Sequence, residues 1–212
     1  MGFIDKKDWW TEIYAETLRP QDLIRLPECS YPTMTDEQKD KLRQTQIFPG
    51  EVVQALGTFA EFWLVRKYDQ TLGWVPSNDL QPSPLQKFPL RTSPMISAEV
   101  CLSQWQGVPY VFGGIGPTGI DCSGFTQRFF WDVYGQQLPK NSWDQRKLGA
   151  EVAWEDLQHH DLIFCHGNGG IHHVVLCHQQ DFWHARRKGG VVQQAREDFV
   201  KEFEIEAIRR LR

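Results

Sequence analysis

The sequence lacks the long apolar runs and the clusters of positive charge that mark two large classes of protein. No stretch approaches the roughly 18–20 apolar residues of a membrane-spanning helix. No run of Lys or Arg is present either, and the 23 basic residues are outnumbered by 27 acidic ones. Because nucleic-acid binding depends on clustered positive charge, we expect neither a nucleic-acid partner nor a membrane partner.

The sequence also lacks the pattern of a secretory signal and any regular spacing of cysteine. Residues 5–8 read Asp-Lys-Lys-Asp, which places charge where a signal peptide has its apolar core. The five cysteines are Cys29, Cys101, Cys122, Cys165 and Cys177. They form no CxxC pair, and the histidines that follow the last two are too irregularly spaced to indicate zinc. We therefore expect reduced thiols, a cytoplasmic location, and no metal ion or other cofactor.

Aromatic residues, in contrast, are abundant, with nine Trp and 13 Phe among 212 residues. The chain is 41% hydrophobic, which is enough apolar material for one large core or two smaller ones. A proline-rich break at 81–84 (QPSP) is typical of a linker. We therefore predict two domains, residues 1–82 and residues 83–212.

Three short runs typical of strands follow one another in the first domain. They are 51–56 (EVVQAL), 62–66 (FWLVR) and 73–76 (GWVP). Short strands at this density predict a small β-barrel. The order of the runs, with Asn-Asp-Leu following at 78–80, resembles the bacterial SH3-like domain, whose last strands end in a GWV…L signature. Another kind of small β-barrel is the alternative.

The second domain has helical patterns first and strand patterns after them. Helices are predicted at 97–106 and 122–134, the second with an apolar stripe. The segments typical of strands are 162–164, 174–176, 190–192 and 203–208. This order predicts an α+β domain, with helices packed on an antiparallel sheet.

Cys122 stands where the second of these helices should begin. Asp121 before it is a good helix cap, so the thiol would lie in the first turn. The positive end of the helix and its free backbone N–H groups lower a thiol pKa and favour the nucleophilic thiolate. The same N–H groups can hold a developing oxyanion. The pattern therefore indicates a nucleophilic cysteine, with a buried, inert thiol as the alternative.

A cysteine nucleophile needs a base, and three histidines in strand-like segments are candidates. His172 and His173 begin one strand, and His184 lies near the start of the next. Alternate residues of a strand share a face, so only one of the adjacent pair should point at the thiol. A hairpin between residues 173 and 184 would bring His184 beside His173.

A series of short motifs between residues 98 and 210 resembles the NlpC/P60 family of papain-like cysteine peptidases. The motifs are 109–114 (PYVFGG), 121–125 (DCSGF), 138–145 (LPKNSWDQ), 160–164 (HDLIF), 173–177 (HVVLC) and 183–185 (WHA). The chain departs from the family pattern at Lys140, where Arg is usual, and at His160 and Val175, where Gly is usual. The resemblance implies a papain-like domain that follows an SH3-like barrel.

The resemblance also implies roles for individual residues. Cys122 matches the family nucleophile and His173 its base. His184 matches the residue that orients the base, and Tyr110 a tyrosine near the thiol. The candidates for substrate binding are Asp121, Ser123 and Ser142 in the peptidase domain and Glu61, Trp63 and Tyr68 in the first domain.

Finally, the resemblance implies a substrate class. The family cleaves the amide bond between γ-D-glutamate and a diamino acid, such as meso-diaminopimelate, in the peptides of the cell wall (murein). The pairing of domains is similar to that of γ-D-glutamyl-L-diamino acid endopeptidases. We expect a monomeric enzyme that acts on free L-Ala-γ-D-Glu-diaminopimelate in cell-wall recycling. A lytic hydrolase of intact peptidoglycan, an acyltransferase with the same Cys/His arrangement, and a non-catalytic peptide-binding module are the alternatives.

Overall fold

The chain divides into two compact units, residues 1–92 and residues 93–212. The computed structural model describes residues 13–85, 87–88, 95–167 and 171–212. The first 12 residues of the predicted N-terminal domain, including the charged stretch at 5–8, therefore lie outside the described part. Within that part, no helix combines the length and the apolar character that a membrane span requires.

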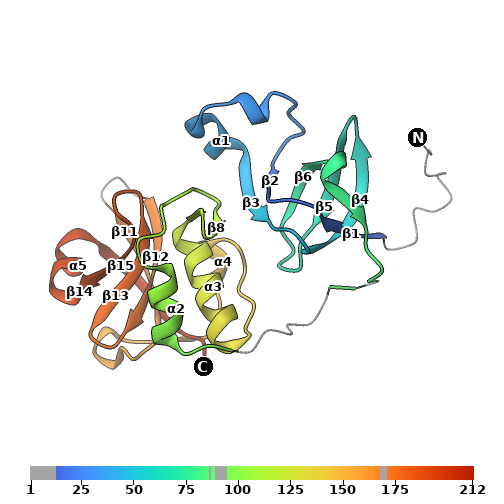
Figure 1. Cartoon of the computed structure of the whole chain (residues 1–212). Helices are drawn as coiled ribbons and strands as arrows, with labels where there is room; N and C mark the ends of the chain where they lie inside the picture. The colour runs from blue at the N-terminus through green and yellow to red at the C-terminus, as the bar shows by residue number, and fades with distance from the viewer. Residues whose placement is uncertain (1–12, 86, 89–94, 168–170) are drawn as a thin grey trace. The chain divides into compact units, whose positions relative to one another are not determined.

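The first unit is built on a seven-stranded sheet with the strand order β3-β2-β6-β5-β4-β1-β7 (Figure 1). Every pair of neighbouring strands is antiparallel. The strands are β1 (Ile13–Thr17), β2 (Gln21–Ile24), β3 (Arg43–Ile47), β4 (Val52–Phe59), β5 (Phe62–Arg66), β6 (Leu72–Pro76) and β7 (Leu80–Pro82). One helix, α1 (Asp36–Leu42), precedes β3 and begins at a capping box formed by Thr35 and Gln38.

The three strands predicted between residues 51 and 76 are confirmed as β4, β5 and β6. Their inward residues Val53, Val65 and Val75 are buried together with Leu23 and Ile47, which is the core that the alternating pattern requires. Strands β3 and β7 end the sheet, and no ladder joins them in the residues that the structure describes. A sheet of short antiparallel strands is therefore present, whereas a closed SH3-like barrel is not shown.

The second unit carries a six-stranded antiparallel sheet with the order β10-β15-β11-β12-β13-β14. The strands are β10 (Ala150–Glu151), β11 (Leu162–Gly167), β12 (Ile171–His178), β13 (Asp181–Arg186), β14 (Gly190–Ala195) and β15 (Glu204–Arg210). A two-stranded ribbon, β8 (Ile115–Gly116) and β9 (Gly119–Ile120), leads into the longest helix. The helices are α2 (Ala98–Trp105), α3 (Cys122–Tyr134), α4 (Ser142–Gln145) and α5 (Arg196–Glu202).

Both faces of this sheet are covered, because alternate residues of its strands point to opposite sides. Val174 and Leu176 of β12 belong to a core that also includes Phe125 of α3 and residues of α2. Val175 belongs to a second core, which includes Phe199 of α5. In Figure 1, α2 and α3 lie side by side, away from α5. The predicted helices and strands of the second domain are thus confirmed, as is the packing of helices on an antiparallel sheet.

Candidate active site

Helix α3 begins at Cys122 because Asp121 caps it. One carboxylate oxygen of Asp121 accepts hydrogen bonds from the backbone N–H of Gly124 at 2.6 Å and from the Ser123 hydroxyl at 2.9 Å. The other accepts from the backbone N–H of Gly113 at 2.8 Å. Asp121 is 5% exposed, so these bonds hold a buried charge in place. The predicted cap is confirmed, and it fixes the chain on both sides of the thiol.

Gly124 allows the first turn of α3 to approach the preceding loop closely. A Cβ atom at this position would lie 2.3 Å from the carbonyl oxygen of Gly114. That distance is a hard clash with backbone, so only glycine fits without movement of the loop. The turn that carries Cys122 is therefore held against residues 113–114 by both the Asp121 cap and this contact.

The thiol of Cys122 lies beside the backbone of β12. It is buried, and burial raises its pKa to about 12, with the negative charge of Asp121 adding to the rise. The backbone N–H groups of Val174, Ser123 and Cys122 act in the opposite direction and favour the thiolate. The expectation that the helix start would lower the pKa of this thiol is therefore wrong, because burial outweighs the N–H groups. In the free protein the thiol is neutral at physiological pH.

His173 of β12 and His184 of β13 form a buried pair, as the predicted hairpin requires. Nε2 of His173 lies 2.7 Å from Nδ1 of His184. Burial lowers the pKa of His173 to about 3 and that of His184 to about 4, so both rings are neutral at physiological pH. One ring must then donate and the other accept. If His173 donates through Nε2, its Nδ1 keeps a lone pair and is available as a base.

Aromatic rings from the far side of the sheet fix the orientation of this pair. The His173 ring is stacked on Phe203, with ring centres 5.4 Å apart and planes 17° from parallel. Phe199 meets the His184 ring edge-on at 6.0 Å. Apolar packing of this kind restricts ring rotation and also accounts for the low pKa values, because it excludes water.

A cavity of about 420 Å³ opens at the start of α3. Its walls include the predicted residues Tyr110, Asp121, Cys122, Ser123 and Ser142. The other lining residues are Phe112, Lys140, Asn141, Trp143, His172 and Arg187. The structure therefore gathers five of the predicted site residues around one space.

The two adjacent histidines of β12 lie differently with respect to this cavity. His172 is exposed, lines the cavity and meets the Trp143 ring at 5.6 Å. His173 does not line it and is 8% exposed, but it directly precedes Val174, whose N–H faces the thiol. Strand β12 thus presents His172 to the cavity and buries His173 against His184. Mutagenesis of each histidine tests which of them is the base for Cys122.

Two cationic side chains of the cavity, Lys140 and Arg187, give it an affinity for carboxylates. The Arg187 guanidinium lies over the Tyr110 ring, 5.5 Å from its centre. Sequence reasoning missed Arg187 because it follows β13 in a turn that belongs to none of the motifs. Its place three residues after His184 is the only hint that the sequence contains.

The three site residues predicted in the first domain, Glu61, Trp63 and Tyr68, lie in the first unit. Glu61 accepts a hydrogen bond from the Cys29 thiol at 2.9 Å and lines a separate cavity of about 470 Å³. Trp63 packs against the core of the first unit, and Tyr68 has the Lys67 ammonium 5.6 Å from its ring centre. Their part in substrate binding stays a prediction.

The raised pKa of Cys122 predicts how the thiol responds to pH. Alkylation by iodoacetamide requires the thiolate, whose fraction grows about tenfold per pH unit as long as the pH is below the thiol pKa. We therefore expect the alkylation rate of Cys122 to rise throughout the range from about pH 6 to about pH 10. Mass spectrometry of the peptide that contains Cys122 measures this rate separately from the other cysteines.

An unstructured peptide of the same sequence is the control, since its rate should level off above the ordinary thiol pKa of about 8.5. A Cys122 rate in the folded protein that is already level between about pH 6 and pH 9 would contradict the neutral resting thiol. Such a plateau would mean that a histidine holds the thiolate in the free protein.

The fold and this site define a class of protein. In this class a capped cysteine begins a helix, and the helix packs on an antiparallel sheet that carries a histidine pair. Residues 107–209 match the model of the NlpC/P60 family. This is the family that the short motifs predict, and the match covers slightly less than half of the chain.

Relatives with assigned names match part of the chain. The chain is 41% identical over 92 residues to a "Probable endopeptidase" of Haemophilus influenzae, which covers 42% of this chain and 57% of the relative. It is 37% identical over 91 residues to the "Murein DD-endopeptidase MepS/Murein LD-carboxypeptidase" of Escherichia coli K12, covering 42% and 48%. It is 42% identical over 73 residues to the "Gamma-D-glutamyl-L-lysine dipeptidyl-peptidase" of Bacillus subtilis 168, covering 33% and 24%.

The chain thus spans about half the length, or less, of these curated relatives. Among solved structures, an NlpC/P60 family protein from Bacillus cereus ATCC 10987 is similar with a TM-score of 0.50. That match is 22% identical and covers 97% of this chain and 65% of the other. At this identity the likeness concerns the fold alone.

Proposed function

We propose that this chain is a cysteine peptidase that hydrolyses the amide bond between γ-D-glutamate and a diamino acid in murein peptides. The observation that carries the proposal is the arrangement of Cys122 at the capped start of α3, next to the β12 residue that follows His173. The assignment of His173 as the base, with His184 as its orienting partner, comes from the family resemblance, because the pair packs on Phe199 and Phe203 and His173 does not line the cavity. His172, which lines the cavity beside Cys122, is the alternative base. The name of the Bacillus subtilis relative, a "Gamma-D-glutamyl-L-lysine dipeptidyl-peptidase", agrees with this bond.

In the proposed reaction, Cys122 is the nucleophile and His173 is the base. Nδ1 of His173 takes the proton from the Cys122 thiol as the sulfur forms a bond to the γ-carbonyl carbon. The electron pair of the C=O bond moves to oxygen, where backbone N–H groups at the start of α3 stabilise the negative charge. Collapse of this intermediate breaks the C–N bond, and the His173 imidazolium gives its proton to the departing amine.

The second half of the reaction returns the site to its starting state. His173 takes a proton from water as the water oxygen attacks the thioester carbon. The C–S bond then breaks, and the sulfur recovers the proton from His173. His184 keeps accepting the hydrogen bond of the His173 Nε2–H throughout, which stabilises the imidazolium while it exists.

Charge in the cavity supports a substrate with several carboxylates. A peptide such as L-Ala-γ-D-Glu-diaminopimelate carries carboxylates on both sides of the bond to be cleaved. We propose that Lys140 and Arg187 bind these groups, with hydrogen bonds from the hydroxyls of Ser123 and Ser142. Asp121 acts mainly through the cap, because both of its oxygens already accept hydrogen bonds. Tyr110 lines the cavity, and its ring lies under the guanidinium of Arg187.

We propose that the first unit gives the enzyme a preference for free peptides. We propose that it has an SH3-like role in the selection of substrates with a free N-terminal L-Ala, and that Glu61, Trp63 and Tyr68 take part in this selection. The short antiparallel strands of this unit support the assignment. A cytoplasmic monomer that recycles free tripeptides is the cellular role that fits such a preference.

Mass spectrometry of products tests the reaction and the substrate together. The free tripeptide L-Ala-γ-D-Glu-meso-diaminopimelate should yield L-Ala-D-Glu and the free diamino acid. The N-acetylated tripeptide should be cleaved at least about tenfold more slowly, because the free amine is part of the recognised substrate. No cleavage of either peptide, or cleavage at another bond, would contradict the proposed reaction; equal cleavage of both would remove only the preference for a free amine.

A second candidate is a hydrolase that acts on intact peptidoglycan. It is favoured by the Escherichia coli relative, whose name includes murein DD-endopeptidase and which is 37% identical over 91 residues. Incubation with purified sacculi separates the two candidates. Release of soluble muropeptides from sacculi at a rate comparable to tripeptide cleavage would favour this second candidate.

A further inference from the structure

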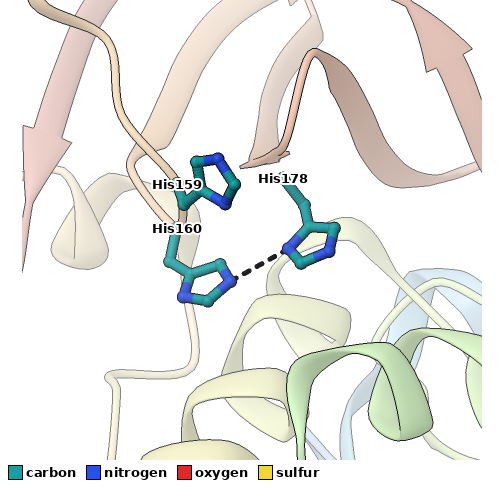
Figure 2. Close-up of side chains that lie close together, drawn as sticks. All are labelled: His159, His160 and His178. Carbon is teal, nitrogen blue, oxygen red and sulfur yellow. Dashed lines mark hydrogen bonds between the residues drawn. The ribbon is translucent and has the colours of Figure 1, made fainter.

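Three histidines of the second unit come together at the end of the sheet where no predicted site residue lies. His159 and His160 lie in the turn before β11, with Asp161 between them and the strand, and His178 is the last residue of β12. The backbone holds the two segments together, since the N–H of His160 donates to the carbonyl of Cys177 at 2.7 Å. Figure 2 shows the three side chains near one another, with a hydrogen bond between the rings of His160 and His178.

Ring nitrogens of the three histidines lie close to one another. One ring nitrogen from each histidine can be chosen so that all three lie within 4.8 Å of one another. Nε2 of His160 and Nδ1 of His178 are 3.0 Å apart. Two nitrogens bound to one tetrahedral Zn²⁺ at its usual bond length of 2.0–2.1 Å stand about 3.3 Å apart. The observed separation needs only a few tenths of an ångström of adjustment.

The outer nitrogens of the two more buried rings face oxygen atoms. The Tyr134 hydroxyl is hydrogen-bonded to Nδ1 of His160. A carboxylate oxygen of Glu99 lies 3.9 Å from Nε2 of His178. Metal-binding histidines commonly direct their second nitrogen to a hydroxyl, carbonyl or carboxylate, which fixes the ring and the tautomer. The surroundings of His160 and His178 follow that arrangement.

The backbone of His160 adds an independent indication. Its φ angle is +70°, in the left-handed region that glycine enters without cost and that a histidine enters at a cost of about 1 kcal/mol. A function of the His160 ring, such as binding a ligand, would account for a histidine at this position.

We propose that His159, His160 and His178 bind a divalent transition-metal ion of the Zn²⁺ class. Imidazole nitrogens suit Zn²⁺, Co²⁺ and Ni²⁺, whereas Mg²⁺ and Ca²⁺ prefer oxygen ligands. Water or the nearby Glu99 carboxylate completes the fourth position.

A second group of possible ligands, His166, His172 and Glu206, fits a metal ion less well. Their ligand atoms also lie within 4.8 Å of one another. However, the Glu206 carboxylate already forms an ion pair with Arg146 at 3.1 Å and contacts Nε2 of His166. A cation placed there would have to compete with a guanidinium for the same oxygen atoms. This group therefore serves as the natural comparison.

The role of the proposed ion is structural. His178 follows His173 by five residues along β12, a distance of about 16 Å at the rise of an extended strand. An ion at the three histidines therefore stands far from the thiol. It would tie the turn before β11 to the end of β12 and stabilise the folded unit in proportion to its affinity.

The test uses the full chain with Cys29 changed to Ser, because an exposed thiol could itself bind metal. After removal of metal with EDTA and dialysis, the protein is titrated with Co²⁺ and, separately, with Zn²⁺. We expect one equivalent of Zn²⁺ to remain bound after gel filtration, visible absorption bands typical of tetrahedral Co²⁺, and a higher melting temperature with Zn²⁺ than with EDTA.

His159→Ala and His166→Ala are the matched variants, one from each group. His159 is exposed, so its replacement should leave the fold intact, and the far-ultraviolet circular dichroism checks this. We expect His159→Ala to lose the bound Zn²⁺ and the shift in melting temperature, and His166→Ala to keep both. No stoichiometric metal in the unmutated protein, or loss in His166→Ala rather than in His159→Ala, would overturn the proposal. Neither outcome depends on peptidase activity.

Discussion

Replacement of Cys122 by Ala should abolish cleavage of the murein tripeptide, with kcat/KM falling by on the order of 10⁴-fold or more. The thiol is the only group in the proposed reaction that forms a bond to the substrate, so no neighbouring side chain can replace it. The fold should be unaffected, because the Asp121 cap and the close packing at Gly124 do not involve the sulfur atom. Product formation followed by mass spectrometry measures the loss, and a thermal melt confirms the fold.

Cys29→Ala is the matched control for this experiment. Cys29 is a free, exposed thiol of the first unit, and its only described hydrogen bond goes to Glu61. This variant should keep full activity if Glu61 does not depend on that bond for its place. Turnover by the Cys122→Ala protein at more than a few per cent of the original rate would refute the covalent mechanism.

The two adjacent histidines of β12 should differ sharply when each is replaced by Ala. Loss of His173 removes the proposed base, and we expect kcat to fall by about 10³-fold. Loss of His172, which is exposed and lines the cavity, should change kcat by less than about tenfold and act mainly on KM. Steady-state kinetics on the tripeptide separate the two effects.

His184 provides a third comparison on the same pair. His184→Asn keeps a side chain that can accept a hydrogen bond from Nε2 of His173, so it should retain more activity than His184→Ala. If His172→Ala proves as inactive as His173→Ala is expected to be, then the histidine in the cavity wall is the base. The buried His173–His184 pair would then have a structural role only.

Much of the second unit could be predicted from the sequence, because its signals are local. Helix α3 begins at Cys122 and ends at Tyr134, the residues predicted, since Asp121 provides a cap and Gly135 adopts the left-handed conformation that ends a helix. The alternation at 203–208 identified β15. The contact between His173 and His184 also followed from the sequence, because a short hairpin pairs neighbouring strands.

The features that could not be predicted depend on long-range packing. Strands β1 and β2 were not recognised, since their pairing with β4 and β6 is what stabilises them. The pKa of Cys122 was predicted in the wrong direction, because the sequence shows the helix start but not the burial of the thiol. Which histidine of β12 lines the cavity depends on the face that each strand residue presents.

The sequence also does not predict the histidine group at residues 159, 160 and 178. His160 and His178 are 18 positions apart in the sequence, and the three histidines do not follow a known metal-binding spacing. They meet because β11 and β12 pair in a register that places Cys177 opposite the turn at His160. Such a site becomes visible only when the register of two strands is known.

The central claim is that the Cys122 sulfur carries the γ-D-glutamyl group during the reaction. It is tested most directly by acid quenching of the enzyme in the presence of excess L-Ala-γ-D-Glu-meso-diaminopimelate, followed by digestion and mass spectrometry. The account predicts an L-Ala-γ-D-Glu adduct, labile to hydroxylamine, on the peptide that contains Cys122. Product formation without any adduct on this peptide, or with the adduct on another residue, would contradict the account.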